Sequence, residues 1–253
     1  MRLVGDPANP RLMTVRTKVD LSPQMQSWAA RRVRELESED LCGYVFKRKS
    51  PSSGRFRVKV YPPGGGSPRS GVGMFARAFI EHFPLLPVEE EGRLQDAGLR
   101  ENFLTRVFAL RRWRDYLRDD GTRGGMVAFH AAHKYLLMAH SPPKLSGMGR
   151  LVAAMKGRRM AAVHEEYQHR FMDALHHHAT PRRITNVLQH IAGYLHEHLT
   201  ADERAELAAE IDRYRTGRAV LPVPLTLVKH YVRKYAIDYL AGQWFFSPYP
   251  AEL

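Results

Sequence analysis

Hydrophobic and polar positions in the first third of the chain predict short strands and helices. Residues 55–60 alternate basic and apolar side chains at a period of two, which is typical of a half-buried strand. A second strand is predicted over 41–46, with helices over 22–36 and 72–83; Ser22-Pro23 supplies a helix-start signal. This order favours an α/β domain, in which ligands usually bind at loops beyond the carboxyl ends of strands. The loop at 47–54 occupies such a place.

The rest of the chain has a helical period. Phe103, Val107, Leu110 and Trp113 recur at helical spacing, so a long amphipathic helix is predicted over 99–117. A linker follows at 119–125, and Thr180-Pro181 and the Thr200/Glu203 capping box mark later helix starts. Helices are predicted over 126–138, 144–155, 159–177, 182–198, 201–216 and 225–240. The pattern therefore predicts an α/β domain over 1–118 and an all-α helical bundle over 126–253.

Charge points to a polyanionic partner. The formal net charge is +13 over 253 residues, with +9 in residues 1–118 and +4 in residues 119–253. Lys and Arg release condensed counterions when they neutralise phosphates, so nucleic acid is the leading candidate. An arginine-rich solvated surface is the alternative. Because the chain has no long apolar run and no secretory pattern at its start, we expect a cytoplasmic protein without a membrane segment.

Four segments carry a resemblance to known families. Residues 5–12, the loop at 47–54 and residues 83–94 resemble the thiouracil desulfurase (TudS-like) family, whereas 129–142 resembles the YbgA-like domain often fused to it. Together they are similar to the tRNA 4-thiouridine desulfidases (RudS-like). The resemblance implies a parallel sheet, binding of tRNA or a thiolated nucleotide, and a [4Fe-4S] cluster on three cysteines whose open iron takes sulfur from the base.

The chain departs from that family at the cluster ligands. The resemblance implies a loop reading Ser-Pro-Ser-Cys-Gly, so Ser53 stands at a ligand position and Ser50 is the serine implicated beside the cluster. The family's other two cysteines lie upstream of Met1. The one cysteine, Cys42, precedes the loop, and we interpret it as a small buried apolar residue. We therefore expect a degenerate enzyme with no cofactor or metal in this chain. A truncated parallel sheet would expose a strand edge and favour a homodimer through it.

Basic residues provide the candidate nucleic-acid contacts. Those around the serine loop could cradle phosphates, and those of the helical half could form an RNA track; solvated basic faces are the alternative for both. Eleven of the thirteen histidines fall between His130 and His198, but no repeated carboxylate spacing supports a metal site, so structural or phosphate-facing roles are favoured. The candidate contacts are Lys47, Arg48, Lys49, Arg55, Arg57, Lys59, Lys134, Arg158, Arg159, Arg182 and Arg183.

Three functions follow from these observations. The leading hypothesis is a desulfidase-family protein that binds tRNA or thiolated nucleotides without cluster-dependent activity. The second is an active [4Fe-4S] desulfidase with non-standard ligation, which would need an upstream extension and an unusual ligand such as Ser53. The third is a structural protein-interaction module, which predicts partner binding that tRNA does not compete away.

Overall fold

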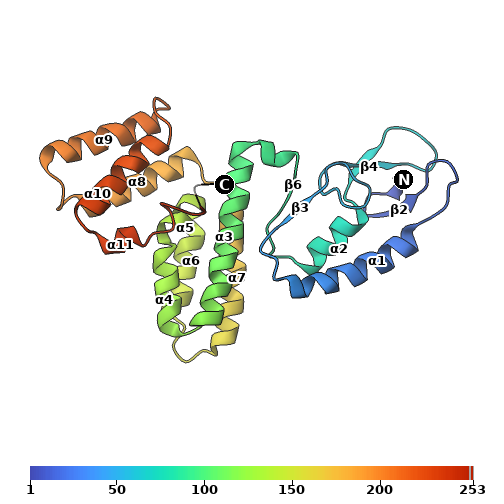
Figure 1. The fold of residues 1–253 in the computed structure, drawn as a ribbon, viewed down its shortest axis with the longest axis horizontal. Coiled ribbons are helices and arrows are strands. Elements are labelled where there is room, and N and C mark those ends of the chain that lie inside the picture. Colours follow the sequence, from blue (N-terminus) through green and yellow to red (C-terminus); the bar gives the residue numbers. More distant parts are fainter. Residues whose placement is uncertain (251, 253) are drawn as a thin grey trace. The chain divides into compact units, whose positions relative to one another are not determined.

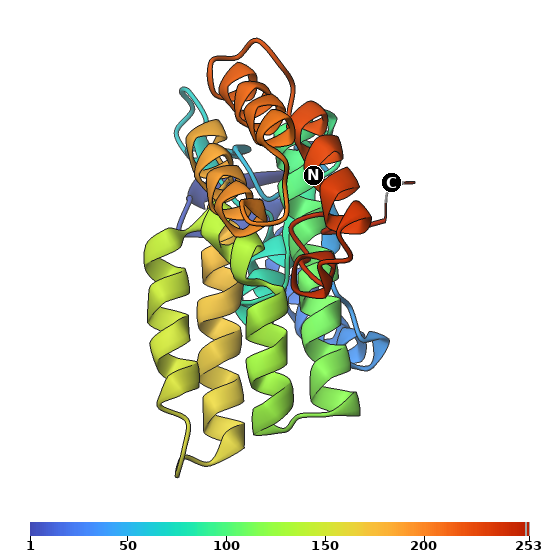
Figure 2. The same cartoon turned by 90° about the vertical axis from the view of Figure 1, so that its left-hand side faces the viewer.

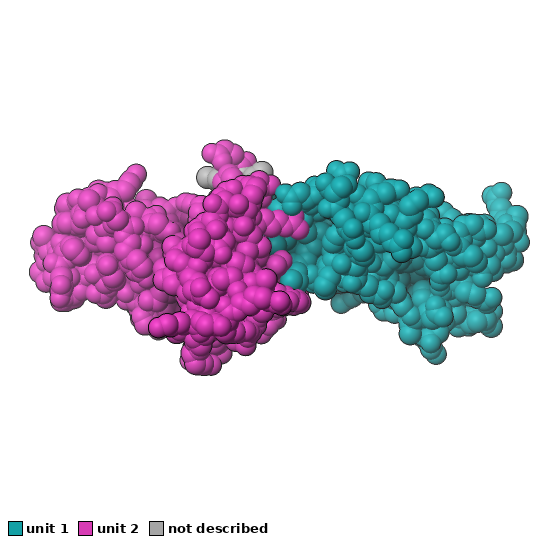
Figure 3. All heavy atoms as spheres, turned by 90° about the horizontal axis from the view of Figure 1, so that it is seen from below, with its two compact units in different colours: residues 1–110 teal, residues 111–253 magenta. Residues whose placement is uncertain are grey.

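The chain forms two compact units. The computed structural model describes residues 1–250 and 252, and divides into an N-terminal unit, Met1–Leu110, and a C-terminal unit, Arg111–Leu253 (Figure 3). The division falls inside helix α3, Ala97–Asp119, and not in the linker predicted at 119–125. That segment is mostly helix: α3 ends at Asp119 and α4 begins at Arg123. A single turn connects two consecutive helices there.

The N-terminal unit contains two small sheets (Figure 1). The four-stranded sheet has the order β2-β1-β4-β5, in which β1 runs parallel to β4 but antiparallel to β2, and β4 is antiparallel to β5. The second sheet is the parallel pair of β3 and β6. The strands are β1 Arg2–Asp6, β2 Asn9–Met13, β3 Tyr44–Phe46, β4 Val58–Tyr61, β5 Arg69–Gly71 and β6 Val88–Glu90.

The α/β class of the N-terminal unit is confirmed; where a truncated parallel sheet was expected, the four-stranded sheet is mixed and the β3–β6 pair is parallel. Only two residues separate β1 from β2, and so short a connection can form only an antiparallel hairpin. In β4, Val58 and Val60 are buried and Lys59 is exposed, as the alternation predicts. Leu3 and Leu12 complete this small core.

Helices α1 and α2 supply the larger apolar contacts of this unit. Helix α1, Ser22–Glu35, continues into a short 3₁₀ turn, and α2, Met74–His82, packs on it. The rings of Phe46, Phe75 and Phe79 are buried, with centroids 5.4 Å apart for Phe46 and Phe79. This aromatic core fixes β3 against α2, and the serine loop leaves from the end of β3. The homodimer through a sheet edge stays a prediction.

The C-terminal unit is the predicted helical bundle (Figure 2). The helix predicted over 126–138 is broken at His133 into α4 and α5, while α8 begins at Thr180-Pro181 and the Thr200/Glu203 capping box is present. In the described residues no helix is long and apolar enough to cross a bilayer. The helices are α4 Arg123–Ala132, α5 Lys134–His140, α6 Pro142–Ala153, α7 Met160–His176, α8 Pro181–Leu195, α9 Ala201–Arg215, α10 Pro222–Lys234 and α11 Asp238–Ala241.

Candidate functional site

The serine loop is a closed turn organised by Ser50. The backbone N–H groups of Ser52 and Ser53 donate to Ser50 Oγ at 3.3 and 3.1 Å, and the Gly54 N–H donates to the Ser50 carbonyl at 2.8 Å. Ser50 Oγ also lies 3.0 Å from Ser52 Oγ. Such side-chain-to-backbone bonds are the ordinary means by which serine stabilises a turn. In the described part of the chain the Ser53 hydroxyl has no hydrogen-bond partner, and Ser53 is half-buried.

The carbonyl groups of the same loop cap α2. Phe75 N–H donates to the Ser52 carbonyl at 2.8 Å, and Gly73 N–H donates to the Gly54 carbonyl at 2.7 Å. A Cβ on Gly73 would lie 2.4 Å from the Ser52 oxygen, so the close approach of loop and helix requires glycine there. Helix starts often bind anions through free N–H groups, but here the loop occupies those donors. An anion at this loop must therefore be bound by side chains.

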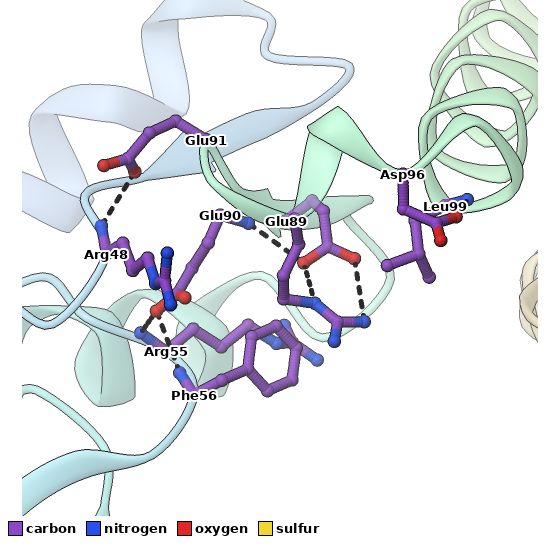
Figure 4. A network of polar contacts seen from close by, with 9 residues as sticks. Arg48, Arg55, Phe56, Glu89, Glu90, Glu91, Asp96 and Leu99 are labelled. Atoms are coloured by element: carbon purple, nitrogen blue, oxygen red, sulfur yellow. Dashed lines mark hydrogen bonds and ion pairs between the residues drawn. The ribbon is translucent and has the colours of Figure 1, made fainter.

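Three consecutive glutamates lie on the other side of the loop: Glu89 and Glu90, which belong to β6, and Glu91, which follows it (Figure 4). Glu90 is 2% exposed, and its Oε1 accepts the backbone N–H groups of Arg55 and Phe56 at 2.7 and 3.0 Å. Glu91 Oε2 accepts the Arg48 N–H at 2.7 Å. Carboxylates that accept backbone N–H groups form strong, charge-assisted hydrogen bonds. Both ends of the serine loop are thus fastened to one acidic segment.

Arginines surround the same carboxylates. Arg93 Nε donates to Glu89 Oε1 at 2.8 Å, and the guanidinium groups of Arg55 and Arg93 lie over the Phe56 ring at 4.9 and 4.4 Å from its centroid. Burial lowers the pKa of Arg106 to about 10, while the charge of Glu89 opposes that effect. Burial also lowers the pKa of Arg55. Arg106 Nε is buried without a hydrogen-bond partner in the described residues.

The six predicted loop cations divide into two groups. Lys47 lies 3.4 Å from Glu91 with a side chain that is 76% exposed, and Arg55 is half-buried beside the glutamates; a phosphate contact by either stays a prediction. Arg48, Lys49, Arg57 and Lys59 are exposed, and Lys49 and Arg57 have φ of 59° and 51°, an uncommon conformation for residues with a side chain. Glu89, Glu90 and Glu91 were missed as site residues. A run of acids at the end of a predicted strand was the signal available in the sequence.

The side chains present do not fit a [4Fe-4S] cluster. Protein ligands for such clusters are normally cysteine thiolates. The loop itself supplies hydroxyls, of which Ser50 Oγ is already used within the turn. Cys42 is half-buried, with Sγ 3.8 Å from the Asp40 carbonyl, so the prediction of a fully buried apolar cysteine is wrong. Because Asp40 adopts a left-handed turn at φ 48°, Cys42 leaves that turn at the surface before β3.

In the C-terminal unit, the Phe129 to His140 motif builds the core. His133 is fully buried; its Nδ1–H donates to the Phe129 carbonyl at 2.8 Å, and Arg112 Nε donates to its Nε2 at 3.1 Å. Burial and the Arg112 charge hold the pKa of His133 well below its usual range. His133 is therefore a neutral structural histidine, in agreement with the structural alternative. Trp113, Tyr167 and Phe171 pack around the motif, with Trp113 stacked on Tyr167 at 5.2 Å.

Arg158 and Arg183, both predicted to belong to an RNA track, lie near opposite ends of α7. Arg158 lies at the start of that helix and pairs with Glu166 at 2.7 Å, whereas Arg183 lies beyond its other end and donates to the carbonyls of His140 and His178. The 17 residues of α7 span about 25 Å at 1.5 Å per residue. Arg183 has a structural role in joining helix ends. The exposed members of the predicted set are Lys134, Arg159 and Arg182.

Comparison with known proteins agrees with this two-part architecture. Residues 1–91 match the family model for 2-thiouracil desulfurase, and residues 134–250 match a protein family of unknown function, DUF1722. The uncharacterized protein YbgA of Escherichia coli strain K12 is 36% identical over 151 residues, 59% of this chain and 89% of YbgA. The chain belongs to the YbgA family. Its YbgA-like part is joined to a 2-thiouracil desulfurase-like part. No solved structure matches.

Proposed function

We propose that this protein binds thiolated nucleotides, within tRNA or free, through the serine loop, without cluster-dependent sulfur removal by the chain's own residues. The match of residues 1–91 to 2-thiouracil desulfurase carries the proposal, since that family acts on a thiolated base. Ser50 and Ser53 lie in the loop after β3, the usual position for ligands in an α/β unit. Ser53 is partly exposed, and its hydroxyl has no hydrogen-bond partner in the described residues. Of the loop's groups it is therefore the one most available to a base.

The loop's donor atoms support binding in preference to desulfuration. An alcohol holds its proton far more tightly than a thiol, whose pKa is about 8.5, so serine is a poor substitute for a cysteine ligand. At the same time the loop is rigidly fixed by Glu90 and Glu91, which keeps its shape independent of any cluster. A preformed loop without thiolates is suited to recognition.

The exposed cations support an RNA ligand. Lys49, Arg57 and Lys59 are exposed, and none of them forms an ion pair within the described residues. Neutralising phosphates with such side chains releases counterions and makes binding salt-dependent. Lys47 and Arg55 contribute less, because glutamates already compensate their charge. Lys49, Arg57 and Lys59 are therefore the residues of the predicted set that we assign to phosphate contacts.

Binding to matched tRNAs with and without 4-thiouridine, titrated across salt, tests the proposal. We expect affinity to fall linearly with salt on a log–log plot, and the thiolated tRNA to bind more tightly. Ser53→Ala should remove that preference while the salt slope stays constant. Ser70→Ala, at an exposed serine of β5, is the matched control and should leave both unchanged. Absence of binding at low salt would overturn the proposal and favour a protein-interaction module.

Anaerobic reconstitution separates binding from catalysis. After incubation with iron and sulfide, the purified protein should retain no stoichiometric cluster, because the loop offers hydroxyls and Cys42 is its one thiol. Iron and sulfide retained at four of each per chain, with release of sulfide from thiolated tRNA, would instead establish an active desulfidase with non-standard ligation.

A further inference from the structure

A cleft in the C-terminal unit combines cationic, hydroxyl and apolar side chains. It has a volume of about 310 Å³ and is lined by residues of α10, α11 and the segment that follows α11. This volume is at the lower end of the range for small-molecule sites. The cleft involves none of the residues discussed above. Its lining residues are Thr226, Lys229, Val232, Arg233, Ala241, Phe246 and Ser247.

Helix α10 has two chemically different faces. On one face, Tyr231 donates to Glu206 and Lys234 to Glu203, at 2.8 and 2.6 Å, so the charge of Lys234 is compensated by α9. Lys229 and Arg233 are on the other face, which lines the cleft. Residues four apart on a helix have Cβ atoms about 6 Å apart, so these two cations can reach one ligand group.

Among the residues that the structure describes, no carboxylate lines the cleft and neither Lys229 nor Arg233 forms an ion pair. Two like charges on adjacent turns of a helix repel each other, so an anion between them would be stabilised. Thr226 and Ser247 add hydroxyl donors at the same opening. Val232 and Phe246, 4% and 7% exposed, form an apolar wall. Phosphate suits the cations and hydroxyls, and a flat apolar group suits the wall.

We propose that this cleft binds the phosphate of a nucleotide, with Lys229 and Arg233 on the phosphate oxygens and the nucleotide's flat part against Phe246. The nucleotide has two possible sources, a free nucleoside monophosphate or the phosphorylated end of an RNA, which present the same chemistry. The inference does not depend on the serine loop. Ser53→Ala tests the preference for a thiolated base, and Lys229→Gln tests nucleotide binding in the cleft. Either proposal can therefore fail without the other.

Isothermal titration of the full chain tests the cleft, with adenosine 5′-monophosphate, adenosine and inorganic phosphate as probes. The monophosphate should bind about tenfold more tightly than adenosine, because its phosphate forms a charge-assisted contact that adenosine lacks. Lys229→Gln and Arg233→Gln should each weaken it by about tenfold. Lys234→Gln removes the same charge from the other face of α10 and should change affinity less than about twofold. Thermal melts establish that the variants are folded.

A second arm distinguishes the sources. A short RNA with a 5′-phosphate is compared with the same RNA lacking it, in the wild type and in Lys229→Gln. A preference for the phosphorylated RNA that Lys229→Gln abolishes supports the RNA end as ligand; monophosphate binding without that preference supports a free nucleotide. The proposal is overturned if the wild type binds no monophosphate, if adenosine binds equally well, or if Lys234→Gln weakens binding as much as Lys229→Gln.

Discussion

Arg106 of the N-terminal unit and Arg112 of the C-terminal unit are both largely buried on α3, and burial lowers the pKa of each to about 10. Their surroundings differ. Arg106 lies near the carboxylate of Glu89, which Arg93 also contacts. Arg112 has no acid among the causes of its shift; it donates to the His133 imidazole and the Pro248 carbonyl, and lies over the Trp244 ring at 4.2 Å.

This difference shows that buried arginine has a different structural role in each unit. In the N-terminal unit, acids and bases form a polar network that shapes the serine loop. In the C-terminal unit, one arginine joins α3, α4 and the C-terminal segment through neutral groups that have no alternative donor. The first arrangement is suited to ligand binding at a surface loop, and the second to holding a bundle together.

Replacing each buried arginine by methionine gives the largest expected effect. Arg112→Met should destabilise the C-terminal unit by about 3 kcal/mol, because the buried His133 Nε2 and the half-buried Pro248 carbonyl lose their donor. Arg106→Met should cost about 1 kcal/mol, since Glu89 keeps Arg93 as a partner; each substitution also removes one buried nitrogen that has no hydrogen-bond partner in the described residues, Nε of Arg106 and Nη2 of Arg112. Hydrogen exchange measured by mass spectrometry, peptide by peptide, reports each unit separately.

The matched control for this pair is Arg100→Met, at an exposed arginine of the same helix, which should change stability by less than about 0.5 kcal/mol. Equal losses for Arg106→Met and Arg112→Met would break the comparison, because they would show that acidic and neutral surroundings support a buried arginine equally.

Removal of the acid that fastens the serine loop has the next largest expected effect. Glu90→Ala leaves the N–H groups of Arg55 and Phe56 without their acceptor, which should cost about 2 kcal/mol and speed exchange at those amides. Glu90→Gln retains one acceptor oxygen and should cost about half as much. Unchanged exchange at Arg55 and Phe56 in Glu90→Ala would contradict the fastening role. Peptides of the C-terminal unit serve as the internal control.

Local structure could be predicted from the sequence wherever a short-range pattern determines it. The alternation of Val58, Lys59 and Val60 identified β4, and Thr180-Pro181 and Thr200/Glu203 identified two helix starts. The helix break at His133 was not predicted, because no Gly or Pro interrupts 126–138. This position is distinguished by the local bond of the His133 side chain to the Phe129 carbonyl and by a tertiary contact with Arg112, 21 residues away.

Long-range pairing in the candidate site could not be predicted. Arg55 and Glu90 are 35 residues apart, and nothing in their local sequence shows that a basic loop meets an acidic strand. The separation of Arg158 from Arg183 could not be predicted either. In the sequence each of them belongs to a basic pair near a helix start, and nothing shows how far apart the two pairs lie. Charge counting identifies a cationic segment. It does not reveal which cations lie beside acids in the folded chain, as Lys47 and Arg55 do.

The smallest expected effect is a difference in the pH response of the two units. Burial holds the pKa of His133 well below its usual range, so this side chain stays neutral in the folded C-terminal unit, and burial also lowers the pKa of His130 and of His164. In the unfolded chain a histidine takes up a proton below about pH 6.5. The unfolded state therefore binds more protons on acidification, and stability present above that pH is lost as pH falls through it.

His133 alone should lower the stability of the C-terminal unit by about 1 kcal/mol between about pH 7.5 and 5.5. His133→Gln should reduce this loss, whereas His190→Gln, at an exposed histidine of α8, should not. In the N-terminal unit the Arg48 N–H and the Lys47 charge lower the pKa of Glu91, so Glu91 stays charged over the same range. Urea titrations followed by hydrogen exchange at both pH values measure each unit. An equal loss of stability in both units would show that the acidic network and the neutral histidine core respond to pH alike. That outcome would contradict the contrast drawn between Arg106 and Arg112.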